Sequence, residues 1–247
     1  MYFQKGKRTV IIVAIIAVVA FILFGGFALY VSIFYHADKE AIEAFTENMN
    51  VEKTELYEGA TVYKTGDSDV GFIFYPGGKV EYTSYEPLMY ELAYQGITCV
   101  LIEMPMNLAI FKPDAANKVL KFVPDVEKWY IGGHSLGGSM AASYLEKESD
   151  KFEGLVLLGS YSTTNLSKKD LKVFSIYGSE DKVMNKTNYD KNKSKLPASM
   201  LEFVIPGGCH SYFGMYGKQK GDGIPTITVE EQISLTAECI GAFINMM

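Results

Sequence analysis

One short segment combines the residue types and spacing that a nucleophilic serine needs. An apolar run, Trp129–Gly132, leads into Gly133-His134-Ser135-Leu136-Gly137, and small residues follow where a helix would begin. A G-x-S-x-G pattern between a strand and a helix is typical of a sharp turn that presents the serine hydroxyl at the helix N-terminus. We expect Ser135 to be the nucleophile and the N–H group of Leu136 to be one oxyanion donor. A phosphate-binding loop is excluded because position 138 is glycine where that motif needs lysine.

A serine nucleophile needs a general base, and the base needs an acid that orients it. Of the three histidines, His36 lies beside an apolar N-terminal run and His134 lies inside the turn, which leaves His210 as the candidate base. The acid should follow the strand before that histidine, where Glu180 and Asp181 are adjacent. We predict that Asp181 is the acid and interpret Glu180 as part of a solvated turn. The resulting chain order is nucleophile, acid, base.

The second oxyanion donor is expected in the loop Tyr75-Pro76-Gly77-Gly78-Lys79, which follows an apolar strand. Gly78 is the first choice and Lys79 the second, while a plain Pro-Gly turn is the alternative interpretation. Asp222 lies between two glycines in the loop 213–227. A calcium site would need further acids at defined spacing, so we interpret this loop as a structural turn. No metal ion and no organic cofactor is expected.

These residues are distributed along a chain in which apolar runs alternate with amphipathic stretches. Continuous apolar runs are expected for strands that are buried on both faces of a parallel sheet. The predicted strands are Thr61–Lys64, Val70–Tyr75, Thr98–Glu103, Lys128–Gly132, Gly154–Leu158, Leu171–Tyr177 and Met200–Ile205. The predicted helices are 37–50, Tyr85–Tyr94, Ala115–Phe122, Leu136–Lys147, Lys186–Lys195 and Val229–Asn245. The alternation predicts an α/β fold with a mostly parallel sheet, whose site lies at the carboxyl ends of the strands.

The N-terminal segment has the length and composition of a membrane span. Residues 10–34 are 25 uncharged residues, which would form about 37 Å of helix against a hydrocarbon core of about 30 Å. Lys5, Lys7 and Arg8 precede the run and acidic residues follow it, so the positive-inside rule places the N-terminus in the cytoplasm and the rest outside. A cleaved signal peptide ending at Ala28 is the alternative, but the apolar run continues beyond that point.

The charge and cysteine content of the chain limit the classes of molecule that it could bind. The chain of 247 residues has 23 basic and 29 acidic residues, a formal charge of −6, and every acid follows the apolar run. An acidic body is a poor partner for nucleic-acid phosphates. The three widely spaced cysteines (Cys99, Cys209 and Cys239) form neither a disulfide framework nor a zinc motif.

Five segments in order resemble the compact bacterial α/β-hydrolases grouped near dienelactone hydrolase. They are Phe74–Val80, Met104–Ala109, Gly132–Gly138, Tyr177–Asp181 and Gly207–Gly214. The resemblance covers about residues 55–247, and it implies the α/β-hydrolase fold with helices on both faces of the sheet and the triad Ser135, Asp181 and His210. Two departures are the Pro76-Gly77 pair at the oxyanion loop and a serine nucleophile where dienelactone hydrolase has cysteine. The segment Ser162–Asp170 is too short for a helical lid, so no substantial cap domain is expected.

Together these features predict residues 1–9 as a cytoplasmic N-terminus, 10–35 as a transmembrane helix, 36–54 as a connecting helix and 55–247 as the hydrolase domain. The predicted function is that of a membrane-anchored, extracellular serine hydrolase that acts on a small-molecule or lipid ester. An acyltransferase would use the same three residues, and product analysis with added alcohols would distinguish it. A catalytically idle binding protein on the same fold is the remaining alternative, which an active-site serine probe would exclude.

Overall fold

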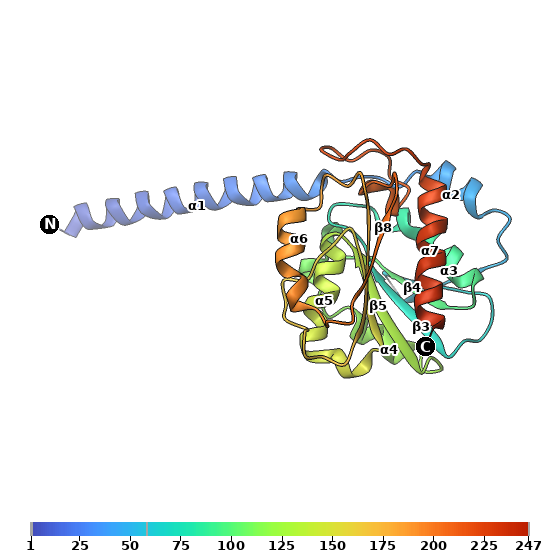
Figure 1. Ribbon diagram of the computed structural model, residues 1–247. Helices are drawn as coiled ribbons and strands as arrows, with labels where there is room; N and C mark the ends of the chain where they lie inside the picture. The colour runs from blue at the N-terminus through green and yellow to red at the C-terminus, as the bar shows by residue number, and fades with distance from the viewer. Residues whose placement is uncertain (1, 58, 247) are drawn as a thin grey trace. The chain divides into compact units, whose positions relative to one another are not determined.

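The computed structural model describes residues 2–57 and 59–246, and it divides into two compact units, Met1–Phe34 and Tyr35–Met247. Figure 1 shows the first as a single helix and the second as a sheet with helices on both faces. The predicted span ended at residue 35, whereas Tyr35 belongs to the second unit, where it forms an isolated parallel bridge with Val80.

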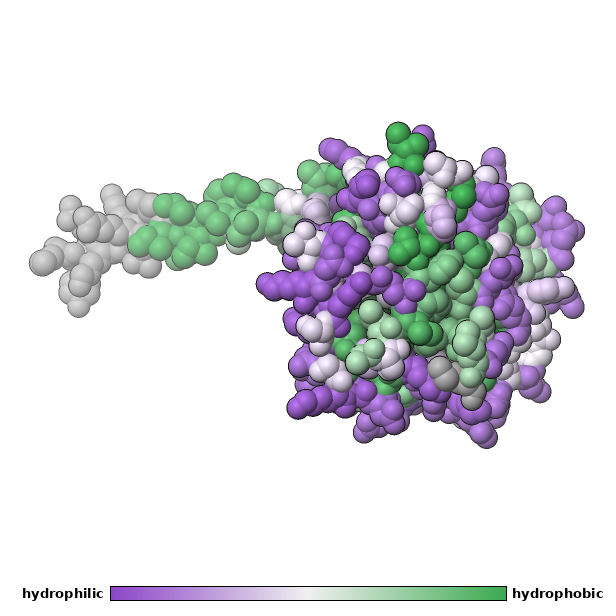
Figure 2. All heavy atoms as spheres, viewed as in Figure 1, coloured by the Kyte–Doolittle hydropathy of each residue, from purple (hydrophilic) through white to green (hydrophobic). Residues whose placement is uncertain are grey.

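The first unit is helix α1 (Tyr2–Ser32). Its segment Ile12–Ser32 is long and apolar enough to cross a membrane, and no part of it is buried within the protein. Figure 2 shows this segment as a continuous hydrophobic surface. A helix of this kind at the N-terminus is either a membrane anchor or a signal sequence, and its orientation stays a prediction.

The second unit is built on one sheet of eight strands in the order β1-β2-β4-β3-β5-β6-β7-β8. Strands β3 to β8 run parallel, while β2 is antiparallel to β4 and β1 is antiparallel to β2. The strands are β1 (Glu52–Tyr57), β2 (Ala60–Lys64), β3 (Val70–Tyr75), β4 (Thr98–Ile102), β5 (Lys128–His134), β6 (Gly154–Leu158), β7 (Lys172–Gly178) and β8 (Leu201–Ile205). The predicted α/β fold with a mostly parallel sheet is confirmed.

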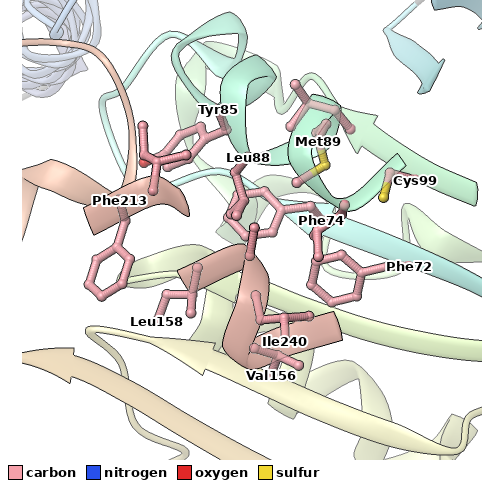
Figure 3. Packing of buried hydrophobic residues seen from close by; sticks show 14 of the residues in the cluster. Phe72, Phe74, Tyr85, Leu88, Met89, Cys99, Val156, Leu158, Phe213 and Ile240 are labelled. Atoms are coloured by element: carbon pink, nitrogen blue, oxygen red, sulfur yellow. The ribbon is translucent and has the colours of Figure 1, made fainter. Parts of the chain in front are cut away.

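Six helices accompany the sheet: α2 (Lys39–Thr46), α3 (Glu86–Tyr94), α4 (Ala116–Phe122), α5 (Leu136–Glu148), α6 (Lys186–Asn192) and α7 (Val229–Asn245). Successive strand residues point to opposite faces, so each strand supplies both cores. Phe72 and Phe74 of β3 pack with α3 and α7, whereas Ile73 and Tyr75 pack with α4 and α5. Figure 3 shows the first of these cores, where Phe74, Tyr85 and Leu88 lie together.

Two differences from the sequence prediction concern the segment before the core strands. Strand β1 was not predicted, because its residues are mostly exposed and it joins the sheet through backbone pairing at the edge. The connecting helix expected over residues 36–54 is shorter, since α2 ends at Thr46 and β1 begins at Glu52. Between β6 and β7, residues 159–171 contain no helix, as expected for a domain without a cap.

Candidate active site

Ser135 lies at the turn between strand β5 and helix α5. Its backbone has φ 51° and ψ −119°, a conformation that L-residues rarely adopt. The N–H group of Ser135 donates to the carbonyl of Leu158, and its own carbonyl accepts a hydrogen bond from Oγ of Ser160 (2.6 Å). These bonds to the end of β6 hold the strained turn in place. The side chain is thereby presented at the N-terminus of α5, as the G-x-S-x-G pattern predicts.

Gly133 and Gly137, on either side of Ser135, allow the backbone of the serine turn to approach the backbone at the end of β3. A Cβ on Gly133 would lie 2.5 Å from the carbonyl oxygen of Tyr75, and one on Gly137 would collide with the carbonyls of Tyr75 and Pro76. Any larger residue would therefore push the turn away from the end of β3. Since β3 and β5 are neighbours in the sheet, the same approach brings the loop after β3 beside the serine.

His210 and Asp181 form a buried pair at the ends of β8 and β7. The Nδ1 atom of His210 lies 2.8 Å from Oδ2 of Asp181, and the two side chains are 1% and 0% exposed. The other carboxylate oxygen of Asp181 accepts the N–H groups of Val183 and Met184. Glu180 instead accepts a hydrogen bond from Ser179. The structure thus brings Asp181, and not Glu180, to the histidine.

The end of β6 lies between this pair and the serine turn. Gly159 follows Leu158, the residue that binds Ser135, and has φ 50°. A Cβ on Gly159 would lie 2.9 Å from Nδ1 of His210 and 3.1 Å from Oδ2 of Asp181. Among the described residues, Nε2 of His210 has no hydrogen-bond partner. This nitrogen is buried, and it makes no hydrogen bond to Oγ of Ser135.

The two predicted oxyanion donors also lie together. A Cβ on Gly78 would be 2.9 Å from Cδ2 and 3.3 Å from Cβ of Leu136, so the two backbones are adjacent. The N–H of Leu136 is the first of helix α5 and has no acceptor in its own helix. The N–H of Lys79 donates to the carbonyl of Asn107 (2.7 Å) and is therefore occupied. Of the two residues considered for the second donor, the geometry favours Gly78.

His134 is buried beneath His210 and takes part in a separate network. Its Nδ1 atom lies 2.8 Å from the hydroxyl of Tyr85, which also accepts the N–H of Gly77. The centroids of the His134 and His210 rings are 4.4 Å apart. Burial lowers the pKa of His134 well below its ordinary value, and a charge on His210 lowers this pKa further.

Two residues that the sequence analysis did not assign to the site hold the loop of His210. Asp222 accepts the backbone N–H groups of Ser211 (2.8 Å) and His210 (3.2 Å), and also that of Lys182 beside the acid. Burial opposes ionisation of Asp222, but these backbone N–H donors keep its pKa below the usual value. Gln232 of α7 binds both the N–H and the carbonyl of Cys209.

The sequence contains no local signal for either of these two roles. Gln232 lies one residue before the apolar Ile233 on α7, but nothing local in the sequence marks its side chain as buried. Asp222 is one acid in a glycine-rich loop, and its partners are 11 and 12 residues away or on another loop.

Within residues 2–57 and 59–246, no group of three His, Cys, Asp or Glu side chains is arranged to hold a metal ion.

Comparison with protein-family models places this geometry in a known context. A model described as the alpha/beta hydrolase family matches residues 71–234. The chain belongs to the alpha/beta hydrolase family. The matched part of this alpha/beta hydrolase begins in β3, ends in α7, and contains the serine turn, the His210–Asp181 pair and Gly78. The assignment of this chain to the relatives of dienelactone hydrolase within that family stays a prediction.

A solved structure agrees with the family at the level of fold. The alpha/beta hydrolase domain is similar to a predicted CIB-like hydrolase from Thermoplasma acidophilum, with 15% sequence identity and a TM-score of 0.53. The similarity covers 77% of this chain and 97% of the other. At such low identity it shows the fold alone. A search of curated protein sequences finds no match.

Proposed function

We propose that this alpha/beta hydrolase is a serine hydrolase that cleaves carboxylic esters with Ser135, His210 and Asp181. The observation that carries the proposal is the arrangement of the three residues on neighbouring strand ends. The strained turn of Ser135 contacts the end of β6. Gly159, which directly follows β6, faces the buried pair of His210 and Asp181, and Nε2 of His210 is buried without a hydrogen-bond partner among the described residues. Nucleophilic catalysis by serine requires this combination of nucleophile, base and orienting acid.

The proposed reaction proceeds through an acyl-enzyme. Oγ of Ser135 attacks the ester carbonyl while Nε2 of His210 takes the hydroxyl proton, and the N–H groups of Leu136 and Gly78 stabilise the tetrahedral oxyanion. The C–O bond to the leaving alcohol breaks as His210 returns the proton to the alkoxide. His210 then removes a proton from water, whose oxygen attacks the acyl carbon. Collapse of the second intermediate releases the carboxylic acid and restores the serine hydroxyl. Asp181 holds the imidazole in the productive tautomer throughout.

The proposed location is the outer face of the cell membrane, with α1 as an uncleaved anchor. Support comes from the apolar segment Ile12–Ser32 and from the basic residues that precede it. Protease treatment of intact cells should degrade the domain, and carbonate washing of membranes should not release it. Protection of the domain from protease would contradict the orientation, and a secreted form that begins at Leu29 would identify α1 as a signal peptide.

Labelling with a fluorophosphonate tests the chemistry directly. The full-length protein should react at Ser135, and Ser135→Ala should not react. A panel of esters with increasing acyl length would then define the preferred substrate. Failure of the folded wild-type protein both to label and to cleave any ester would refute the proposed function.

A further inference from the structure

We propose that the rim of the active site docks on an anionic lipid bilayer and that the enzyme takes an amphiphilic ester from that bilayer. This inference rests on the proposed function, since it names the substrate class of the same site. The rim is defined as three exposed apolar residues and three exposed lysines at the carboxyl ends of the strands. They are Met106, Ile110, Lys182, Lys218, Lys220 and Ile224.

The first observation is where the chain enters the domain. Tyr35 follows the end of α1 by three residues, and such a connection spans at most about 10 Å. Its N–H donates to the carbonyl of Lys79 (2.8 Å), and its carbonyl accepts the N–H of Glu81 (2.9 Å). Lys79 directly follows the proposed oxyanion donor Gly78. Whatever the orientation of α1, the chain therefore enters the domain at the loop that lines the active site.

Tyr35 is also bound to the other side of the site. Its hydroxyl accepts the N–H of Lys220, and its ring lies 5.7 Å from that of Tyr216. Lys220 belongs to the loop that contains Asp222, which holds His210. The entry point is thus hydrogen-bonded to both loops beside the proposed catalytic residues, so the chain that follows α1 joins the domain at the rim.

The second observation is the apolar character of the rim. Met106 and Ile110 are 54% and 56% exposed in the loop after β4, and Ile224 is 85% exposed in the loop after His210. The first loop borders the site, because Asn107 accepts the N–H of Lys79 and Leu108 approaches Gly78. Exposed apolar side chains beside an active site are typical of surfaces that contact a membrane or a partner. The apolar segment Ile12–Ser32, joined to the domain through Tyr35, favours a membrane over a protein partner as the occupant.

The third observation is charge. The protein as a whole is acidic, with a formal charge of −6, yet Lys182, Lys218 and Lys220 are exposed around one side of the site. None of the three forms an ion pair in the part of the chain that the structure describes. Lysines held near a membrane surface are attracted to anionic headgroups within a Debye length of about 8–10 Å. The rim therefore has the two features of an interfacial surface, apolar side chains and cationic ones.

Rate measurements on two substrates separate docking from catalysis. The full-length protein is reconstituted into vesicles of phosphatidylcholine and phosphatidylglycerol, and given either a water-soluble acetyl ester or a long-chain ester dissolved in the bilayer. The triple variant Met106→Ser, Ile110→Ser, Ile224→Ser should lose about tenfold in the rate on the bilayer ester and less than about twofold on the soluble one. The control variant Tyr94→Ser, Leu201→Ser changes apolar residues that are 66% and 46% exposed away from the rim, and should change neither rate.

The lysines are tested by lipid composition. Lys218→Glu, Lys220→Glu should slow cleavage of the bilayer ester in mixed vesicles and not in pure phosphatidylcholine, since only the mixed surface is anionic. Lys121→Glu, Lys147→Glu is the matched control, because these two lysines are also exposed but lie on helices α4 and α5 and not in the rim. Equal losses on both esters, or no loss on the bilayer ester in either rim variant, would overturn the proposal.

A second measurement does not depend on activity. The native Trp129 is 5% exposed, so a tryptophan introduced at the surface gives a separable signal. Ile224→Trp should be quenched by brominated phospholipids in the vesicle, and Tyr94→Trp should not. Absence of quenching at position 224 would refute docking even if the esterase is active. Quenching in a protein that cleaves no ester would support docking and refute the proposed function instead.

Discussion

Oδ2 of Asp181 and Nδ1 of His210 lie 2.8 Å apart in a pair that is almost completely shielded from water. The other oxygen of the carboxylate accepts two backbone N–H groups, which fix its position independently of the imidazole. Asp181, in the loop after β7, is therefore held firmly enough to orient His210, in the loop after β8. We therefore expect substitutions in this pair to reduce activity more than those elsewhere in the site, apart from Ser135 itself.

Ser135→Ala should abolish ester hydrolysis, because the attacking oxygen is lost. Removal of a triad nucleophile lowers kcat by about 10⁶ in well-studied enzymes. Circular dichroism and thermal unfolding should be unchanged, since the side chain is only half-buried. Activity within about tenfold of wild type would be incompatible with Ser135 as nucleophile.

Asp181→Asn should lower kcat by about 10⁴, because an amide no longer holds the productive imidazole tautomer. Glu180→Gln is the matched control, since its side chain binds Ser179 and not the histidine. The rates of the two variants on one soluble ester provide the comparison. A greater loss in Glu180→Gln would show that the wrong neighbour was assigned.

Gly159→Ala should reduce activity far more than it reduces stability. The added methyl group would press on both His210 and Asp181, and a displacement of about 1 Å in a catalytic group can cost about 10² in rate. Gly96→Ala is the control, because Gly96 also has a positive φ of 85° but no atom within 4 Å of the added Cβ. Both variants should be less stable by about 1 kcal/mol from backbone strain. Equal activities in the two variants would exclude the proposed steric effect.

Asp222→Ala should lower kcat by about tenfold to a hundredfold, because the loop of His210 loses its carboxylate support. Asp222→Asn should be intermediate, since the amide oxygen can replace only one of the two acceptor oxygens. Asp67→Ala, at a fully exposed position, is the control for loss of one acid. Steady-state kinetics of the three variants provide the measurement, and wild-type kcat in Asp222→Ala would contradict the positioning role.

Stability should fall as the pH is lowered through about 6.5, in part because of His134. Its pKa is lowered in the folded protein, so the unfolded chain binds one more proton below about pH 6.5. Each such proton contributes a slope of about 1.4 kcal/mol per pH unit, with stability greater at higher pH. His134→Gln can keep the bond to Tyr85 without titrating. Thermal unfolding in detergent between pH 7 and about pH 5.5 should show a shallower loss for this variant, and identical slopes would refute the assignment.

Much of the fold could be predicted because the information is local. The buried strands β3 and β6 are continuous apolar runs bounded by turn residues, and both were predicted with their observed ends. The serine turn could be predicted for a similar reason, because Gly133 and Gly137 are required by contacts within one strand–turn–helix unit. The order of nucleophile, acid and base along the chain then indicated the remaining site residues.

Other features depend on contacts between residues far apart in the chain, for which the sequence contains no local pattern. Strand β1 is held by backbone pairing at the edge of the sheet and by long-range contacts such as the ion pair of Lys53 with Glu86, so its mostly polar residues did not indicate a strand. The attachment of Asp222 to the backbone of His210, and of Tyr35 to Lys79, exists only once separate loops meet at the carboxyl ends of the strands. The sequence by itself determined which segments form most of the core, and it predicted which residues could carry out the proposed chemistry. Only the tertiary structure decided which neighbouring groups hold those residues in place, because a hydrogen bond between loops leaves no periodicity in the chain.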